Sequence, residues 1–128
     1  MEYRRFVIDS SVLVALYNSG DSLHQKAVEI FQELDAQVLI IHPYVIQETA
    51  TVLAYKLGQK VAVKFLNDIE DAVNVIIPSM EIRDNILCFI EVKKKISFTD
   101  AVIIDLAKSL NAKLITFDRQ MLKLFNSK

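Results

Sequence analysis

Short apolar runs alternate with longer amphipathic stretches along the whole chain. The short runs are rich in Val, Ile and Leu, and each predicts a buried strand; they cover residues 5–9, 38–41, 73–77 and 113–116. Between them, apolar residues recur at helical spacing. This predicts helices over residues 11–17, 23–34, 43–57, 60–71, 80–93, 99–110 and 120–125. Strands that alternate with helices indicate an α/β fold of three layers, a doubly wound parallel sheet of four or five short strands with helices on both faces.

Local signals support several of these boundaries. Pro43 suits the first turn of a helix, where its missing N–H costs nothing, and Gly58 suits the position just after a helix end. In the helix over 80–93 we expect Ile82, Ile86, Phe89 and Ile90 to face inward.

Composition limits the classes of function. The chain has 128 residues, of which 52% are hydrophobic, so we expect one domain over residues 1–128. Its net charge is -1, and any contact with nucleic acid must therefore depend on a local patch or a bound metal. The one cysteine, Cys88, fits a reducing compartment and a core position. No apolar run is long enough to cross a membrane, so we expect a cytoplasmic protein.

Four carboxylates follow or flank the predicted strands. Asp9 ends the first strand, Glu48 lies in the helix after the second, Asp100 opens the helix before the fourth, and Asp118 follows the fourth. Parallel α/β sheets bind ligands beyond the carboxyl ends of their strands, so we expect these acids to gather at one edge. Gathered carboxylates repel each other, and a divalent cation that prefers oxygen ligands, Mg²⁺ or Mn²⁺, relieves that repulsion.

Each acid also has a structural interpretation. Asp9 could cap the following helix, as could Ser10 or Ser11. Glu48 could lie at the rim of an apolar helix face with its carboxylate in solvent. Asp100 could serve the dipole of its own helix, and Asp118 could be a turn residue. Basic side chains also have two interpretations. The run Lys93, Lys94 and Lys95, and Arg119 directly after Asp118, are either solvated side chains or contacts for phosphate groups.

The ordered set of segments resembles the PIN-domain family. The segments are Val7–Leu16, Val45–Glu48, Ser97–Ala101 and Thr116–Arg119, and the likeness is greatest to the small VapC-type toxin ribonucleases. The resemblance implies an endoribonuclease that depends on Mg²⁺ or Mn²⁺. Asp9, Glu48, Asp100 and Asp118 match its catalytic acids, with Asp9, Asp100 and Asp118 as metal ligands and Ser10 and Thr116 as supporting residues. It also implies an RNA substrate, a homodimer and a cognate antitoxin that blocks the site.

One departure concerns the end of the chain. Family members carry a further short strand after the last helix, and here only Phe125–Lys128 remains for it. Among rivals, a response-regulator receiver needs an acidic pair after the first strand, and a haloacid-type phosphatase needs a second Asp at position 11, where Ser11 stands. The remaining alternative is a PIN-like module that binds RNA or protein and cleaves poorly.

Overall fold

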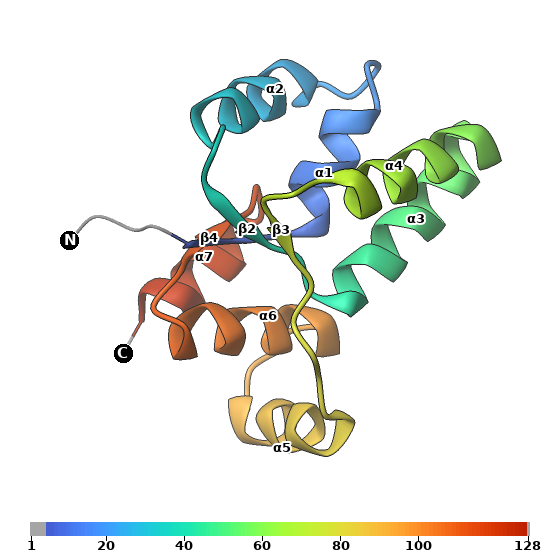
Figure 1. The fold of residues 1–128 in the computed structure, drawn as a ribbon. Coiled ribbons are helices and arrows are strands. Elements are labelled where there is room, and N and C mark those ends of the chain that lie inside the picture. Colours follow the sequence, from blue (N-terminus) through green and yellow to red (C-terminus); the bar gives the residue numbers. More distant parts are fainter. Residues whose placement is uncertain (1–4, 128) are drawn as a thin grey trace.

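A computed structural model describes residues 5–127, which form a four-stranded parallel sheet with helices around it (Figure 1). The strands are β1 (Arg5–Ile8), β2 (Val38–Ile40), β3 (Val75–Ile76) and β4 (Lys113–Ile115), in the order β3-β2-β1-β4. In the central strand, Val7 pairs with Ile40 on one side and with Leu114 on the other. The predicted α/β architecture is confirmed; β3 is shorter than the run 73–77, and no fifth strand occurs among residues 5–127.

Seven helices occur in the described part of the chain. They are α1 (Ser10–Tyr17), α2 (His24–Glu33), α3 (Pro43–Leu57), α4 (Gln59–Asp71), α5 (Ile82–Val92), α6 (Phe98–Ser109) and α7 (Arg119–Asn126). In Figure 1, α1, α2 and α4 lie above the sheet and α6 lies below it, while α5 lies farther out, beyond α6. None of the helices within residues 5–127 combines the length and apolar character that a membrane span requires.

The core surrounds β1 on both faces. Consecutive strand residues point to opposite faces of a sheet, and both Val7 and Ile8 are completely buried. Ile103 of α6 and Leu53 of α3, also completely buried, belong to the same core cluster. The sheet is therefore covered on both faces, which explains why its strands are apolar without alternation.

Helix α3 begins and ends at the residues that the sequence indicates. Pro43 is its first residue, and the preceding His42 accepts a hydrogen bond from the backbone N–H of Tyr44 at its ring Nδ1, 3.0 Å away. Burial lowers the pKa of His42, which keeps this acceptor neutral. Gly58 ends the helix with φ +103°, a conformation that suits glycine, and α4 starts at the next residue and lies against α3.

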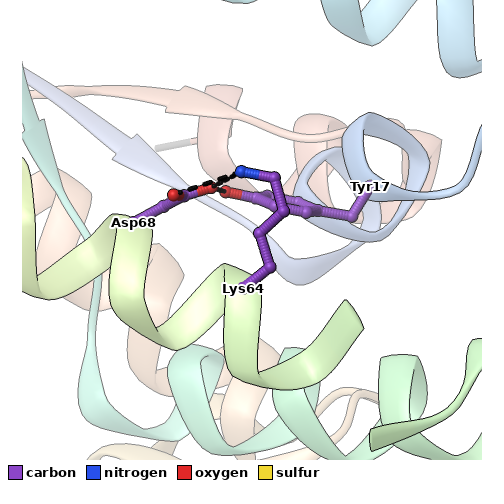
Figure 2. A network of polar contacts seen from close by, with 3 residues as sticks. All are labelled: Tyr17, Lys64 and Asp68. Atoms are coloured by element: carbon purple, nitrogen blue, oxygen red, sulfur yellow. Dashed lines mark hydrogen bonds and ion pairs between the residues drawn. The ribbon is translucent and has the colours of Figure 1, made fainter. Parts of the chain in front are cut away.

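Helix α4 is also bonded to α1. The Tyr17 hydroxyl at the end of α1 donates to Asp68 Oδ2 over 2.6 Å, and Lys64 Nζ lies 3.2 Å from the same oxygen (Figure 2). Burial and the bond to Asp68 raise the pKa of Tyr17, while the bond from Tyr17 lowers the pKa of Asp68. The Tyr17 ring meets Phe65 edge-on at 5.4 Å. These contacts fix α1, whose first turn follows Asp9.

The predicted orientation of α5 is wrong. Ile82, Ile86 and Ile90 are 47%, 43% and 63% exposed, Phe89 is also exposed, and no residue of α5 is buried. The inner face instead carries Asn85 and Cys88, which bond to α3 and α6. Cys88 is thus half-buried against a helix rather than part of the core. The physical reason is that α5 is apolar on most of its circumference, so its periodicity did not decide which side meets the protein.

Candidate active site

The four acids come from four connections at the carboxyl edge of the sheet. Asp9 directly follows β1, and Asp118 lies three residues past the end of the neighbouring β4. Glu48 lies in α3, which starts just after β2, and Asp100 lies in the first turn of α6. The Asp9 N–H donates to the Ile115 carbonyl over 2.9 Å, which joins the ends of β1 and β4. We call these four side chains the acid cluster.

Asp9 is buried and held by two hydroxyl groups. Ser11 Oγ and Thr116 Oγ1 each donate to Asp9 Oδ2 over 2.7 Å. Both of these bonds are made to Oδ2, and no partner within residues 5–127 bonds Oδ1. Asp9 stands at the N-cap of α1 but makes no side-chain capping bond, and the capping interpretation is therefore wrong for this residue.

Ser11 was not predicted as a site residue. Besides bonding Asp9, its Oγ accepts from the Phe117 N–H over 3.1 Å and lies 3.4 Å from Thr116 Oγ1. It therefore links the start of α1 to the end of β4. The signal in the sequence was the Ser10–Ser11 doublet: neighbours on a helix point about 100° apart, so the two hydroxyls serve different partners.

Ser10 serves Glu48. Its Oγ donates to Glu48 Oε1 over 2.6 Å and connects α1 to α3. Glu48 is partly exposed, as expected for a residue at the rim of an apolar face, but its carboxylate is bonded within the protein rather than free in solvent. The bond turns Glu48 toward the helix that follows Asp9.

The pKa of Asp100 reflects the burial and the negative charge of the site. Burial raises its pKa to about 6 together with the carboxylates of Asp9, Glu48 and Asp118, against a smaller lowering by the Ser97 hydroxyl. Ser97, not Asp100, caps α6, because its Oγ accepts from the Asp100 N–H over 3.1 Å. The carboxylate of Asp100 is therefore not needed for capping. The negative charges of all three other acids raise its pKa.

Asp118 has two roles in the geometry. Its Oδ1 caps α7 by accepting from the N–H groups of Gln120 and Met121, at 2.9 and 3.2 Å, so the structural interpretation holds for this oxygen. Its own N–H donates to Thr116 Oγ1 over 3.0 Å. Thr116 thus bonds both Asp9 and Asp118, and it fixes the spacing between the ends of β1 and β4.

The carboxylates of the acid cluster are ligands that suit a hard cation, but these side chains are separated from one another. Carboxylate oxygens are the ligands that Mg²⁺ and Mn²⁺ prefer. Yet within residues 5–127 no three His, Cys, Asp or Glu side chains lie close enough together to hold an ion as they stand. Mg²⁺ commonly keeps several waters and takes only one or two carboxylates. The cluster therefore fits a cation that is bound partly through water.

The basic residues lie beside this edge. Arg119 is the first residue of α7 and follows Asp118 directly. The carbonyl of Lys95 accepts from Gln120 Nε2 over 2.9 Å, so the segment with Lys93, Lys94 and Lys95 is bonded to the start of the same helix. Arg119 and all three lysines are exposed. Positive charge is thus placed next to the acid cluster, although the chain as a whole is slightly negative.

Comparison with known proteins places this geometry in a family. The fold is similar to the crystal structure of VapC20 from Mycobacterium tuberculosis, with a TM-score of 0.82 and 21% sequence identity over 93% of this chain and 94% of that chain. A search among curated proteins found no match. The family model of the PIN domain matches residues 6–125, which include the whole acid cluster. The chain therefore belongs to the PIN domain family.

Proposed function

We propose that this protein is an endoribonuclease that hydrolyses RNA phosphodiester bonds with the help of Mg²⁺ or Mn²⁺. The observation that carries the proposal is the state of Asp100, a half-buried acid whose pKa is raised by burial and by three further carboxylates at the same sheet edge. Such crowding destabilises the apo protein and is relieved by a cation. Membership of the PIN domain family supports the same reaction class.

Asp9, Asp100 and Asp118 are the proposed metal ligands, with Glu48 as the fourth catalytic acid. A bound cation would lower the pKa of a water molecule and stabilise negative charge on the phosphate. The chain's own contribution is to hold the acids: Ser11 and Thr116 orient Asp9, and Ser10 orients Glu48. No His is needed in this scheme, because the acids and the bound water suffice.

The proposed RNA contacts are Lys93, Lys94, Lys95 and Arg119. Their support is the bond between Gln120 and Lys95, which keeps the lysine segment beside the helix that starts at Arg119. Cations at this position offset the repulsion between the acid cluster and the phosphates of RNA. Phosphate contacts of this kind position a nucleic acid without reading its sequence.

We further propose a biological setting. VapC20 is a toxin that cleaves the sarcin-ricin loop, and the likeness in fold supports a toxin of a toxin–antitoxin pair for this chain as well. In that setting the protein acts in the cytoplasm, forms a homodimer and is blocked by a cognate antitoxin. Growth arrest on expression of the wild-type chain, relieved by Asp9→Asn, would support this role. Harmless expression of an active nuclease would contradict it.

The reaction is tested with purified protein and RNA. We expect cleavage with Mg²⁺ or Mn²⁺, none with excess chelator, and none for Asp9→Asn. A matched control is Asp105→Asn, which removes an exposed acid of α6 outside the acid cluster and should cleave like the parent. Cleavage that persists in chelator, or in Asp9→Asn, would contradict the metal-dependent mechanism.

One observation favours a second candidate, a PIN-like module that binds RNA or protein and cleaves poorly. It is the open spacing of the acids in residues 5–127, where no three of them share an ion as they stand. This candidate predicts RNA binding that does not change with metal and no cleavage by the parent. The cleavage assay therefore separates the two.

A further inference from the structure

Two phenylalanines stand apart from the apolar core. The chain has seven, and five of them belong to a core cluster or pack against one: Phe6, Phe31, Phe65, Phe117 and Phe125. Within residues 5–127, Phe89 of α5 and Phe98 of α6 do neither. Phe89 is 39% exposed, and Phe98 is partly exposed. Aromatic surface that lies outside the core and reaches solvent can contact another molecule.

A tyrosine extends this pair of rings. The ring of Tyr44, near the start of α3, lies 5.9 Å from that of Phe98, and the Phe98 ring lies 5.4 Å from that of Phe89. Tyr44 is also partly exposed, and it lies outside both core clusters of residues 5–127. Ring centroids at these separations are in ordinary aromatic contact. We call Tyr44, Phe89 and Phe98 the aromatic group.

Neighbouring side chains hold the Tyr44 ring in place. Asn85 Nδ2 donates to its hydroxyl over 2.9 Å, and the ring of the buried His42 lies 4.5 Å from its own. Asn85 and Phe89 are one turn apart in α5, so one face of that helix supports both Tyr44 and the ring of α6. A ring that is held before binding loses little freedom when a ligand stacks on it.

The aromatic group lies beside the acid cluster. Glu48 follows Tyr44 by one turn on the same face of α3. Asp100 follows Phe98 by two residues in the first turn of α6, and the starts of these two helices lie side by side (Figure 1). The lysine segment ends at Lys95, three residues before Phe98. Carboxylates, aromatic rings and cations therefore occur together at the starts of α3 and α6.

This combination of side chains fits a nucleotide. A ribonucleotide combines an anionic phosphate with a base whose flat face is apolar. Proteins hold unpaired bases by stacking them on aromatic rings, and such stacking tolerates any base because every base has a π-face. An unpaired base next to a phosphate at the acid cluster would meet Tyr44 one turn from Glu48, and Phe98 two residues from Asp100.

We propose that Tyr44 and Phe98 form a subsite on which one unpaired base of the RNA stacks, next to the phosphate at the acid cluster. Asn85 and Phe89 are positioning residues, because they hold the two rings. The subsite rests on the proposed function, since RNA is the substrate that it takes. It assigns contact with a base to the starts of α3 and α6 and leaves contact with phosphate to the lysine segment.

The subsite is tested by the affinity of the full chain for a short labelled RNA, measured by fluorescence anisotropy. Ca²⁺ replaces Mg²⁺, because it binds oxygen ligands and we expect it to leave the RNA uncut. Phe98→Leu and Tyr44→Leu keep apolar bulk but remove a ring, and each should bind about tenfold more weakly than the parent. Tyr44→Phe restores the ring and should regain most of the affinity that Tyr44→Leu loses.

Tyr55→Leu is the matched control, since it removes an exposed ring of α3 outside the aromatic group. It should bind RNA like the parent. Equal affinity of the parent and both Leu variants, or an equal loss in Tyr55→Leu, would overturn the subsite.

An RNA that lacks one base tests the stacking without a substitution in the protein. An abasic nucleotide is placed at each position of the labelled RNA in turn. We expect one position at which the missing base weakens binding to the parent about tenfold, while Phe98→Leu shows no further loss there. This non-additivity identifies the base that stacks on the ring. Equal losses in the parent and Phe98→Leu at every position would overturn the subsite.

Two further measurements separate the subsite from the metal site and from the proposed function. Mn²⁺ affinity without RNA, measured by calorimetry, should be the same in Phe98→Leu and the parent. An equal fall in Mn²⁺ and RNA affinity would assign the effect to Asp100 and overturn the subsite. Cleavage by the parent without coupling between ring and base would also overturn the subsite and leave the proposed function intact. Coupling without any cleavage in Mg²⁺ or Mn²⁺ would contradict the proposed function alone.

Discussion

Two hydroxyl groups on one oxygen give Asp9 a defined direction. Because Ser11 and Thr116 both bond Oδ2, the carboxylate cannot rotate without losing hydrogen bonds in a buried site. A carboxylate fixed in this way presents Oδ1 in one orientation. Ligands held ready before binding lose less free energy to reorganisation when the cation arrives.

Removal of the Ser11 hydroxyl should therefore weaken the site. Ser11→Ala leaves both Asp9 Oδ2 and the Phe117 N–H with one partner fewer, and we expect a loss of stability of about 1 kcal/mol. Mn²⁺ affinity, measured by calorimetry, should fall severalfold. Ser19→Ala, in an exposed turn, is the matched control and should change neither quantity. Unchanged Mn²⁺ affinity in Ser11→Ala would show that Ser11 is only structural.

Asp100 makes stability depend on pH in a definite direction. Its pKa in the folded protein is about 6, above the ordinary value of 3.8, so the folded state holds the proton more tightly than the unfolded state does. The resulting stabilisation is complete below about pH 4 and is lost as pH rises through about 6. Metal binding at the proposed site, which would need the Asp100 carboxylate, should strengthen over the same range.

Asp100→Asn should remove this dependence in the absence of metal. Since one pKa unit corresponds to about 1.4 kcal/mol, and solvent screens a partly exposed group, we expect the variant to be more stable than the parent by about 1–2 kcal/mol at pH 7.5 and by little at pH 4. Melting curves in chelator measure the difference. Asp105→Asn controls for the loss of one negative charge. If Asp100→Asn melts earlier at every pH, the carboxylate serves its helix dipole instead.

The sequence showed the acids but not all their partners. Asp9 and Asp118 could be identified because each follows an apolar strand, and parallel strands bring such positions to one edge. Ser11 could not, since its second partner, Phe117, is 106 residues away and the rotation of α1 decides which serine of the doublet faces β4. Capping by Asp118 was also ambiguous, because a turn acid and a site acid look alike in the sequence.

At the scale of elements, the bond between Tyr17 and Asp68 joins α1 to α4. Tyr17→Phe keeps the ring contact with Phe65 and removes only the hydroxyl that donates to Asp68. We expect a loss of about 1–2 kcal/mol, since hydrogen bonds to charged groups exceed neutral ones and this site is partly exposed. Urea denaturation measures it. Tyr55→Phe removes the hydroxyl of an almost fully exposed tyrosine and should have no effect, and an equal loss in both variants would contradict the role of the bond.

Periodicity predicted most elements but not how each one faces. Helices α3 and α6 lie within a residue or two of the predicted ranges, because their apolar spacing is flanked by Pro43, Gly58 and Ser97. Strand β3 has only two residues, because only Val75 and Ile76 pair with β2. The apolar run 73–77 could not show where this pairing begins and ends. The inward face of α5 was mispredicted. A helix that is apolar on two sides has a helical periodicity, but this periodicity does not indicate which side packs against the protein.

At the scale of the whole molecule, a net charge of -1 must coexist with the proposed binding of RNA. Lys93, Lys94 and Lys95 replaced together by Gln should weaken RNA binding about equally across sequences. The slope of log affinity against log salt should fall by about 0.7 for each phosphate that the variant no longer neutralises. Lys56, Lys60 and Lys113, all exposed, give a matched triple Gln variant with the same charge. Equal weakening by both triples would show that only net charge matters.

The hydrogen bond between Thr116 and Asp9 joins residues 107 positions apart, and β4 is the last strand of the described chain. A chain grows from its N-terminus at about 5–20 residues per second, and domains fold as units. Asp9 is therefore made before Thr116, Asp118 and the neighbouring β4, and it lacks these partners until they have been made. A nascent chain on the ribosome holds an incomplete set of acids. The order of the strands thus delays the assembly of the site until β4 has been made, so the proposed ribonuclease activity is absent while the earlier part of the chain is being translated.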